Sequence, residues 1–409
     1  MSSEITACRS CSKPGLEPFL NLGRTPLADR ILTTAQLEEH EPTYPLVVAF
    51  CPSCGLMQIT ETVAPDELFC DDYPYFSSFS DYLLEHSREN VLDLIERRKL
   101  GKDSFVVELA SNDGYLLKNY VEHGIPVLGI DPADGPAAAA EKIGVPTRNE
   151  FFTKQLAQEL VAQGIRANVI HGNNVLAHVA DTNGFVSGMA DLLKDDGVIV
   201  IEAPYAKDLI DHCEFDTIYH EHLCYFSVTA LNNLFRQHGL YLNEIKQLPI
   251  HGGSLRLYVE KHENVGDSVK NLLAVEQAEK VDKIDFYRDF SARVEHVKAA
   301  LLKLLTELKA QGNSIAAYGA AAKGSTLINY MGIGTDLIDF VVDRNVHKQG
   351  RYMPGKHIPI LAPEQLMERR PDYVLILPWN VTEEILKQQQ EYRDQGGKFI
   401  VPIPEPRIL

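Results

Sequence analysis

The sequence is short of positive charge. Its 409 residues include 57 acidic and 39 basic side chains, which gives a formal net charge of −18. Binding to a nucleic-acid backbone requires local clusters of Lys and Arg, so this balance argues against nucleic acid as the main partner. A single nucleotide ligand is compatible with it, because one basic pocket is enough.

The sequence also lacks long apolar runs and a secretion signal. No uninterrupted apolar stretch approaches the roughly 20 residues that span a bilayer, and the N-terminus has no basic-then-apolar pattern. We therefore expect a cytoplasmic protein without a membrane partner. The length leaves room for two or three domains, and there is no short tandem repeat. A monomer is expected, although the sequence leaves the oligomeric state open.

A complete glycine fingerprint for dinucleotides is missing too. The turn after an apolar strand at 105–109 reads Ala-Ser-Asn-Asp-Gly and keeps only the last glycine of G-x-G-x-x-G. NAD needs these glycines so that the backbone can approach its pyrophosphate, whereas S-adenosylmethionine has no phosphate. The turn therefore favours S-adenosylmethionine, with Asp131 binding the ribose; the alternative is a packed strand end with a turn aspartate. The candidate cofactor residues are Glu108, Ala110, Asn112, Asp113, Gly114, Tyr115, Leu116, Asp131, Pro132 and Asn173.

Cysteine, by contrast, is present in a meaningful pattern. Cys8-x-x-Cys11 and Cys51-x-x-Cys54 each bring two thiolates within reach of one ion, and together they complete the tetrahedral sulfur set of a structural zinc site. The alternatives are a redox disulfide pair or four unrelated buried thiols. The remaining cysteines, Cys70, Cys213 and Cys224, are unpaired by spacing and are expected to be reduced.

The strand and helix pattern predicts an α/β protein with two sheet domains. Strands at 105–109, 127–130, 167–171 and 198–201 alternate with helices, which indicates a doubly wound parallel sheet. A long helical run at 265–308 leads to a second alternating block with strands at 314–318, 337–342 and 373–377. The pattern before the first block is a Pro-rich zinc module, then an aromatic stretch at 73–82, then a helix.

The segment Tyr219-His220-Glu221-His222 places a phenol, two imidazoles and a carboxylate together after a strand. Proton abstraction beside a carbonyl needs a base of near-neutral pKa and a donor for the oxyanion, which His and Tyr supply. The alternatives are structural histidines or a second metal site. Asn174 and His178 are one helical turn apart and able to face one cavity, unless Asn174 only caps a helix.

Two further segments suit a pyrophosphate. The first joins a glycine turn at 252–253 to Ser254 and Arg256, and the second places Lys323 and Ser325 at the start of a helix after a strand. The alternative is that Arg256 and Lys323 are ordinary solvated residues. Arg344 and Lys348 near another strand end are weaker candidates.

Together these motifs resemble one enzyme family. The opening Cys8-Arg-Ser-Cys11 with residues 21–29, the strand and turn at 108–114, the Tyr-His-Glu-His segment and the Tyr-Gly-Ala-Ala-Ala-Lys-Gly segment at 318–324 are similar to the three-domain sugar C-methyltransferases of deoxysugar pathways. The motifs cover essentially the full chain. Two departures are Ala110, where many methyltransferases have glycine, and the extra His220.

The resemblance implies three domains and a reaction. They are a zinc-binding domain at 1–68, a Rossmann-like S-adenosylmethionine domain at 69–300 that includes the linker helix, and a smaller Rossmann-like domain at 301–409. A nucleotide-linked 4-keto-6-deoxyhexose would lie between the last two and receive the methyl group on carbon 3. The implied catalytic residues are His222 as base, with Tyr219, Glu221, Asn174, His178 and one of Tyr73 and Tyr75.

Three alternatives remain at this stage. One is an NAD-dependent epimerase or dehydrogenase that uses Tyr219 and Lys323 as its acid and base, although the incomplete glycine fingerprint weakens it. Another is a non-catalytic zinc-ribbon binding module with degenerate nucleotide folds. The third keeps the methyl transfer but changes the acceptor to another small ketone.

Overall fold

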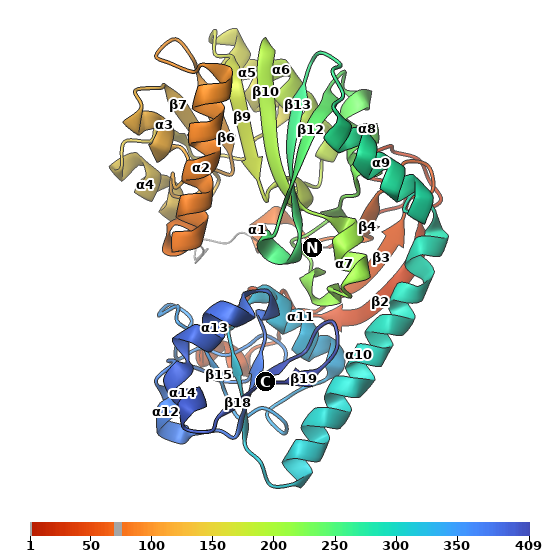
Figure 1. Cartoon of the computed structure of the whole chain (residues 1–409), viewed down its shortest axis with the longest axis vertical. Coiled ribbons are helices and arrows are strands. Elements are labelled where there is room, and N and C mark those ends of the chain that lie inside the picture. Colours follow the sequence, from red (N-terminus) through yellow and green to blue (C-terminus); the bar gives the residue numbers. More distant parts are fainter. Residues whose placement is uncertain (1, 69–75) are drawn as a thin grey trace.

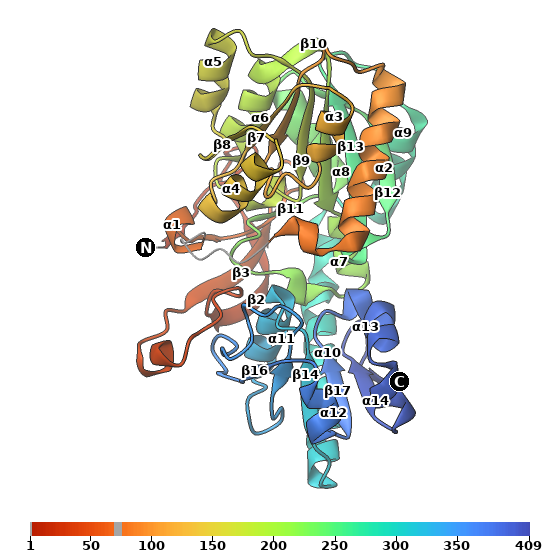
Figure 2. The same ribbon diagram turned by 90° about the vertical axis from the view of Figure 1, so that its left-hand side faces the viewer.

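A computed structural model describes residues 2–68 and 76–409 of the chain. Figure 1 shows a large sheet domain at the top, a smaller one at the bottom, and two successive helices along one side, α9 (Asp267–Glu279) beside the upper domain and α10 (Ile284–Ala310) below it. In Figure 2 the N-terminal module lies between the two larger domains. Among the described residues, no helix is long and apolar enough to cross a membrane.

The N-terminal module is built on a four-stranded antiparallel sheet in the order β11-β4-β3-β2. Its own strands are β2 (Glu17–Thr25), β3 (Tyr44–Phe50) and β4 (Met57–Ile59). The fourth strand, β11 (Cys224–Tyr225), comes from the central domain and pairs with β4. Short elements complete the module: β1 (Ser3–Glu4), β5 (Glu61–Thr62), η1 (Ala35–Glu38) and α1 (Pro65–Leu68).

The central sheet has seven strands in the order β12-β13-β10-β9-β6-β7-β8. The predicted strands appear as β6 (Val106–Leu109), β7 (Val127–Ile130), β9 (Ala167–Asn173) and β10 (Leu193–Pro204), and β8 (Thr147–Arg148) extends the parallel part. The four predicted strands pair in parallel, which confirms the prediction, but the sheet continues at one edge with two strands that the sequence analysis did not include. There β13 (Ser254–Glu260) and β12 (Tyr241–Leu248) add an antiparallel hairpin, because only a short 3-10 turn, η5 (Ile250–Gly252), connects them.

Helices cover both faces of this sheet, as the doubly wound pattern requires. Val106 packs on one face with α2 (Asp81–Arg98), α3 (Lys118–Glu122) and α4 (Asp134–Lys142). Val107 points to the other face, because side chains alternate along a strand. That face packs against α5 (Lys154–Ala162), α6 (Thr182–Leu192) and α8 (Val228–Gln237).

The expected long helix at 265–308 is two helices. They are α9 (Asp267–Glu279) and α10 (Ile284–Ala310). The helical run breaks at Lys280, which has the left-handed φ of 60° that often ends a helix. Near its start, α10 contacts the N-terminal module, where the Tyr287 ring lies 5.1 Å from Phe19 and 4.8 Å from Phe50.

The C-terminal domain has a six-stranded sheet in the order β16-β15-β14-β17-β18-β19. Its strands are β14 (Ile315–Tyr318), β15 (Val341–Val342), β16 (Ile360–Leu361), β17 (Tyr373–Ile376), β18 (Lys398–Val401) and the antiparallel edge strand β19 (Arg407–Ile408). The predicted strand at 337–342 is therefore only its last two residues. The helices are α11 (Ala322–Met331), α12 (Gln365–Arg369), α13 (Thr382–Gln388) and α14 (Gln390–Asp394).

Candidate functional site

The four predicted zinc ligands lie together. The Cys8 and Cys54 sulfurs are 3.5 Å apart, those of Cys11 and Cys51 are 3.6 Å apart, and all four lie within 4.8 Å of one another. Four sulfurs around a zinc ion at about 2.3 Å would be about 3.8 Å apart, whereas a disulfide needs about 2.05 Å. The donor set and its spacing therefore fit zinc and exclude disulfides among these cysteines.

Side chains around the sulfurs tie the site to its surroundings. The fully buried Gln58 donates its Nε2–H to Cys8 Sγ at 3.2 Å and accepts the Arg9 backbone N–H at 3.0 Å. From the central domain, the Asn233 amide donates to the Cys54 carbonyl at 3.0 Å, and Asn183 donates to the Arg9 carbonyl at 2.7 Å. The Gln58 amide, which donates to a sulfur, orients a metal ligand directly, whereas the two asparagines hold the backbone of the module against the central domain.

The predicted cofactor turn has an unusual backbone. Ala110, Asn112 and Gly114 all have positive φ, at 56°, 49° and 77°. Ala110 thus adopts the left-handed conformation that glycine takes in related turns, at a steric cost of about 1–2 kcal/mol. A Cβ on Gly114 would lie 3.1 Å from Val145, so this position also requires a small residue.

Asp131 fixes the shape of this turn. Its carboxylate accepts the Asn112 N–H at 2.8 Å and the Ala133 N–H at 2.9 Å. Each carboxylate oxygen has a second lone pair, so a ribose hydroxyl can still bind. Pro132 follows Asp131 at the same sheet edge, and Asn173 ends β9, which lies on the other side of β6.

The segment before α2 covers the turn. The Ser77 N–H donates to Asn112 Oδ1 at 2.9 Å, and the Ser78 N–H donates to Asp113 Oδ2 at 3.2 Å. Tyr73 and Tyr75, predicted as active-site candidates, lie outside the described residues. The aromatic stretch therefore approaches the cofactor turn in the part that the structure describes.

Behind the turn, Glu108 is buried at the end of β6. Burial and the nearby Asp131 carboxylate raise its pKa well above the usual value. Tyr115 and Leu116 point into the apolar core under α2. Their side chains thus support the turn from inside the domain.

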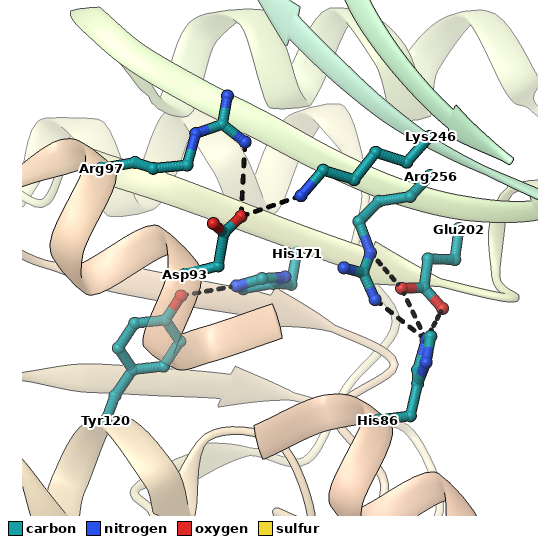
Figure 3. A network of polar contacts seen from close by, with 8 residues as sticks. All are labelled: His86, Asp93, Arg97, Tyr120, His171, Glu202, Lys246 and Arg256. Atoms are coloured by element: carbon teal, nitrogen blue, oxygen red, sulfur yellow. Dashed lines mark hydrogen bonds and ion pairs between the residues drawn. The ribbon is translucent and has the colours of Figure 1, made fainter. Parts of the chain in front are cut away.

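Arg256 lies in a buried ionic network that the sequence did not reveal. Figure 3 shows it with Glu202 and His86, which come from β10 and α2. Arg256 Nε donates to Glu202 Oε1 at 2.6 Å, and His86 Nε2 lies 2.9 Å from Glu202 Oε2. The Glu202 carboxylate thus neutralises the Arg256 guanidinium, so no phosphate is needed to balance its charge. Ser254 is also buried and donates to the Ile250 carbonyl at 3.1 Å.

His222 and Tyr219 form a hydrogen-bonded pair. His222 Nδ1 lies 3.0 Å from the Thr217 carbonyl oxygen, and its Nε2 lies 3.0 Å from the Tyr219 hydroxyl. Because a carbonyl only accepts, Nδ1 carries a proton, and when the ring is neutral its lone pair is on Nε2, facing the Tyr219 hydroxyl. The geometry therefore gives His222 the tautomer of a base that acts through Nε2.

His178 joins this cluster, but not from an α-helix as predicted. It ends the 3-10 helix η3 (Leu176–His178), and Asn174 has a left-handed φ of 52°, so the two residues do not share a helical face. The His178 and His222 rings meet edge to face with centroids 4.7 Å apart. Burial lowers the pKa of His178 to about 4, so this ring is neutral beside His222.

The other two residues of the Tyr-His-Glu-His segment face other domains. His220 Nε2 donates to the Pro45 carbonyl of the N-terminal module at 3.0 Å. Glu221 is buried, and its pKa is raised by burial and by Asp29, against the opposing effect of Lys348. Lys348 itself donates to the Ala320 carbonyl at 2.7 Å.

Lys323 and Ser325 open α11, as the sequence predicted. Lys323 Nζ lies 2.8 Å from Asn380 Oδ1 and 4.5 Å above the Trp379 ring, and burial lowers its pKa. Ser325, two residues further along the helix, is buried. The Lys323 ammonium therefore lies at the start of α11, at the boundary with the central domain.

Comparisons with known proteins agree with this arrangement. Three family models match in order: a zinc binding domain at residues 8–69, a methyltransferase domain at 83–245 and a C-methyltransferase C-terminal domain at 249–404. The chain is 36% identical over 409 residues to the C-methyltransferase NovU of Streptomyces niveus, across 99% of this chain and 97% of that protein.

Two solved structures match part of the chain. One is the magnesium protoporphyrin IX methyltransferase ChlM of Synechocystis PCC 6803 with bound SAM, with 13% identity, 44% of this chain, 82% of that chain and a TM-score of 0.34. Another is the YcgJ protein of Bacillus subtilis, with 12% identity, 44% of this chain, 100% of that chain and a TM-score of 0.35.

The full-length match sets aside the dehydrogenase and the non-catalytic binding module. The cofactor is S-adenosylmethionine, and the four-cysteine cluster belongs to a zinc-binding domain. The chain is a member of the S-adenosylmethionine-dependent C-methyltransferases that carry an N-terminal zinc-binding domain.

Proposed function

We propose that this C-methyltransferase acts on carbon 3 of a nucleotide-linked 4-keto-6-deoxyhexose, in the biosynthesis of branched deoxysugars. Family membership supports transfer to carbon, and the motif resemblance supports the sugar. The observation that carries the proposal is the fixed tautomer of His222, whose Nδ1–H donates to the Thr217 carbonyl at 3.0 Å. We keep the domain boundaries of the sequence analysis, 1–68, 69–300 and 301–409, as part of this proposal.

His222 would remove the proton from carbon 3. A carbon beside a ketone is acidic enough for an enzymic base, and the C–H electrons move toward the ketone oxygen as the proton goes to Nε2. Tyr219 lies 3.0 Å from Nε2 and can turn its hydroxyl to the developing oxyanion. S-adenosylmethionine, when bound, would supply a sulfonium methyl group that such a carbon nucleophile attacks, with S-adenosylhomocysteine leaving as the neutral thioether. The proposal places His178 and Asn174 beside this pair, and it gives Glu221, whose side chain lies near Asp29 and Lys348, a role through the segment that it shares with His222.

The diphosphate would bind at the start of α11. Lys323 supplies a cation there and the helix supplies backbone N–H groups, a combination that favours phosphate. Ser254, Arg256 and Ser325 complete the proposed substrate contacts. Arg256 donates directly to the Glu202 carboxylate, whereas Lys323 donates to the neutral Asn380 amide and meets the charges of Asp216 and Glu214 without a direct hydrogen bond among the described contacts, so we expect Lys323 to contribute more of the binding energy.

The test is His222→Ala with a panel of acceptors. Thymidine and guanosine diphosphate 4-keto-6-deoxyhexoses and a simple small ketone are incubated with labelled S-adenosylmethionine and scored by mass. We expect the variant to lose methylation and solvent-deuterium exchange at carbon 3, with the Kd for S-adenosylmethionine unchanged, because the base is separate from the cofactor turn.

His220→Gln is the matched control. It changes the adjacent histidine, and glutamine can still donate to the Pro45 carbonyl. This variant should keep its activity. Exchange that survives in His222→Ala, or an equal loss of cofactor affinity, would contradict the proposed role of His222.

A further inference from the structure

The segment before the base is held by the C-terminal domain. It comprises η4 (Phe215–Thr217) and Ile218. The Phe215 ring meets Tyr330 of α11 edge to face at 5.6 Å, and the Thr326 hydroxyl donates to the Ile218 carbonyl at 3.2 Å. Asp216, between them, accepts the Trp379 Nε1–H at 2.9 Å. The C-terminal domain thus contacts both sides of Thr217.

Thr217 is the residue whose carbonyl orients the base. The His222 Nδ1–H donates to this oxygen, so the direction of the carbonyl sets both the tautomer and the orientation of the ring. A tilt of the peptide between Thr217 and Ile218 would turn the Nε2 lone pair away from the substrate carbon. Geometry of this kind matters because a displacement of about 1 Å can lower a rate by about 100-fold.

The contact between Asp216 and Trp379 is suited to hold this segment. Asp216 is fully buried, and burial raises its pKa to about 6, against the effects of the Lys323 ammonium and the Trp379 N–H. Trp379 begins the 3-10 helix η6 (Trp379–Val381) and also lies under Lys323. A buried carboxylate that loses its hydrogen-bond donor is destabilised by the free energy of its desolvation. The hydrogen bond between Asp216 and Trp379 therefore opposes separation of the two residues.

We propose that Trp379 and Asp216 are positioning residues for His222. Through them the C-terminal domain fixes the Thr217 carbonyl and so the base, in addition to any contact with the nucleotide. The proposal rests on the proposed function in one respect, since it takes His222 as the base. Neither residue touches the cofactor turn at 110–114, which lies at the end of β6.

Trp379→Phe tests the proposal directly. Phenylalanine keeps an aromatic ring under Lys323 but removes the N–H that Asp216 accepts. We expect kcat to fall about 10- to 100-fold, with the KM for the acceptor found in the panel and the Kd for S-adenosylmethionine both within twofold of wild type. Deuterium exchange at the acceptor carbon should fall in the same proportion.

Two variants serve as comparisons. Asp216→Asn keeps an oxygen that can accept the Trp379 N–H, so it should retain more kcat than Asp216→Ala. Glu41→Ala removes a different contact of the C-terminal domain, with the Gly355 N–H and His357 Nε2 at 3.0 Å, and should leave kcat within twofold. Trp379 is the only tryptophan of the chain, so its fluorescence reports the contact in the Asp216 variants.

A spectroscopic measurement needs no substrate. In ¹⁵N spectra of the imidazoles, His222 should show one tautomer in the wild type and a mixture in Trp379→Phe, with the signal identified by its loss in His222→Ala. Thr326→Val provides a second test on the same peptide, with the same expected mixture, if Trp379→Phe does not fold.

Three results would overturn the proposal. They are an unchanged kcat and tautomer in the folded variant, a parallel loss of cofactor affinity, and an equal loss of kcat in Glu41→Ala. Failure of the proposed function is distinguishable from these, because exchange would then survive in His222→Ala. Failure of the positioning role alone would leave exchange lost in His222→Ala and normal in Trp379→Phe.

Discussion

Replacing Gln58 with leucine should weaken zinc binding while leaving the four cysteines in place. The Gln58 side chain is fully buried, and its Nε2–H lies 3.2 Å from Cys8 Sγ. Its Oε1 accepts the Arg9 N–H at 3.0 Å. Leucine has a similar size but can make neither hydrogen bond.

The size of the effect follows from these two contacts. Hydrogen bonds to charged groups contribute about 1.5–3 kcal/mol, and the Arg9 N–H left without an acceptor adds to the loss. Removal of an outer partner of a metal ligand typically lowers metal affinity about 10- to 100-fold, which corresponds to about 1.4–2.7 kcal/mol. The two figures agree, and we expect a loss of about 2 kcal/mol in zinc binding.

The assay is a competition between the protein and a chromophoric chelator of known zinc affinity. Asn233→Ala is the matched control, since Asn233 donates to the Cys54 carbonyl at 3.0 Å and not to a sulfur. We expect its zinc affinity to stay within threefold of wild type. Wild-type affinity in Gln58→Leu, or equal losses in both variants, would refute the role given to the Gln58 amide.

Two further predictions concern stability. Burial lowers the pKa of His171 to about 3 and that of His178 to about 4 in the folded protein, whereas both are about 6.5 in the unfolded chain. Below pH 6.5 the unfolded chain therefore binds protons on these rings that the folded protein does not bind. Stability should therefore fall on acidification below pH 6.5, by about 1.4 kcal/mol per pH unit for each ring; urea unfolding from pH 7 to pH 5 measures this, and a flat profile would contradict it. Ala110→Gly should leave the free energy of unfolding unchanged or raise it by about 1 kcal/mol. Glycine removes the steric strain of alanine at φ 56°, and this gain is at least as large as the conformational entropy that glycine adds to the unfolded chain. A loss above about 1 kcal/mol on thermal unfolding would contradict that reasoning.

Local patterns were enough to predict the zinc ligands and most of the strands. Two Cys-x-x-Cys turns define their own geometry, and β6 and β7 are buried apolar runs that end at polar turns. Lys280 and Asn174 escaped prediction because left-handed backbone at a residue other than glycine has no clear sequence signal. For this reason the predictions of one helix at 265–308 and of a shared helical face for Asn174 and His178 were wrong.

Partners that are distant in the sequence were also missed. Arg256 pairs with Glu202 and His86, and Asp216 pairs with Trp379, across elements that only the tertiary fold brings together. Composition and periodicity show that a residue is polar or buried, but they do not identify its partner. The sequence therefore selected candidate residues for the site, while the hydrogen bonds that orient His222 could not be predicted from it.

The pairing of β11 with β4 affects how the chain acquires its shape during synthesis. The first module leaves the ribosome well before Cys224 and Tyr225 are made, so the outer edge of β4 has no neighbour at that stage. Open strand edges promote misassociation between chains. A fragment ending near residue 68 would keep this edge exposed permanently, so the metal-bearing module depends on the later polypeptide for its completion.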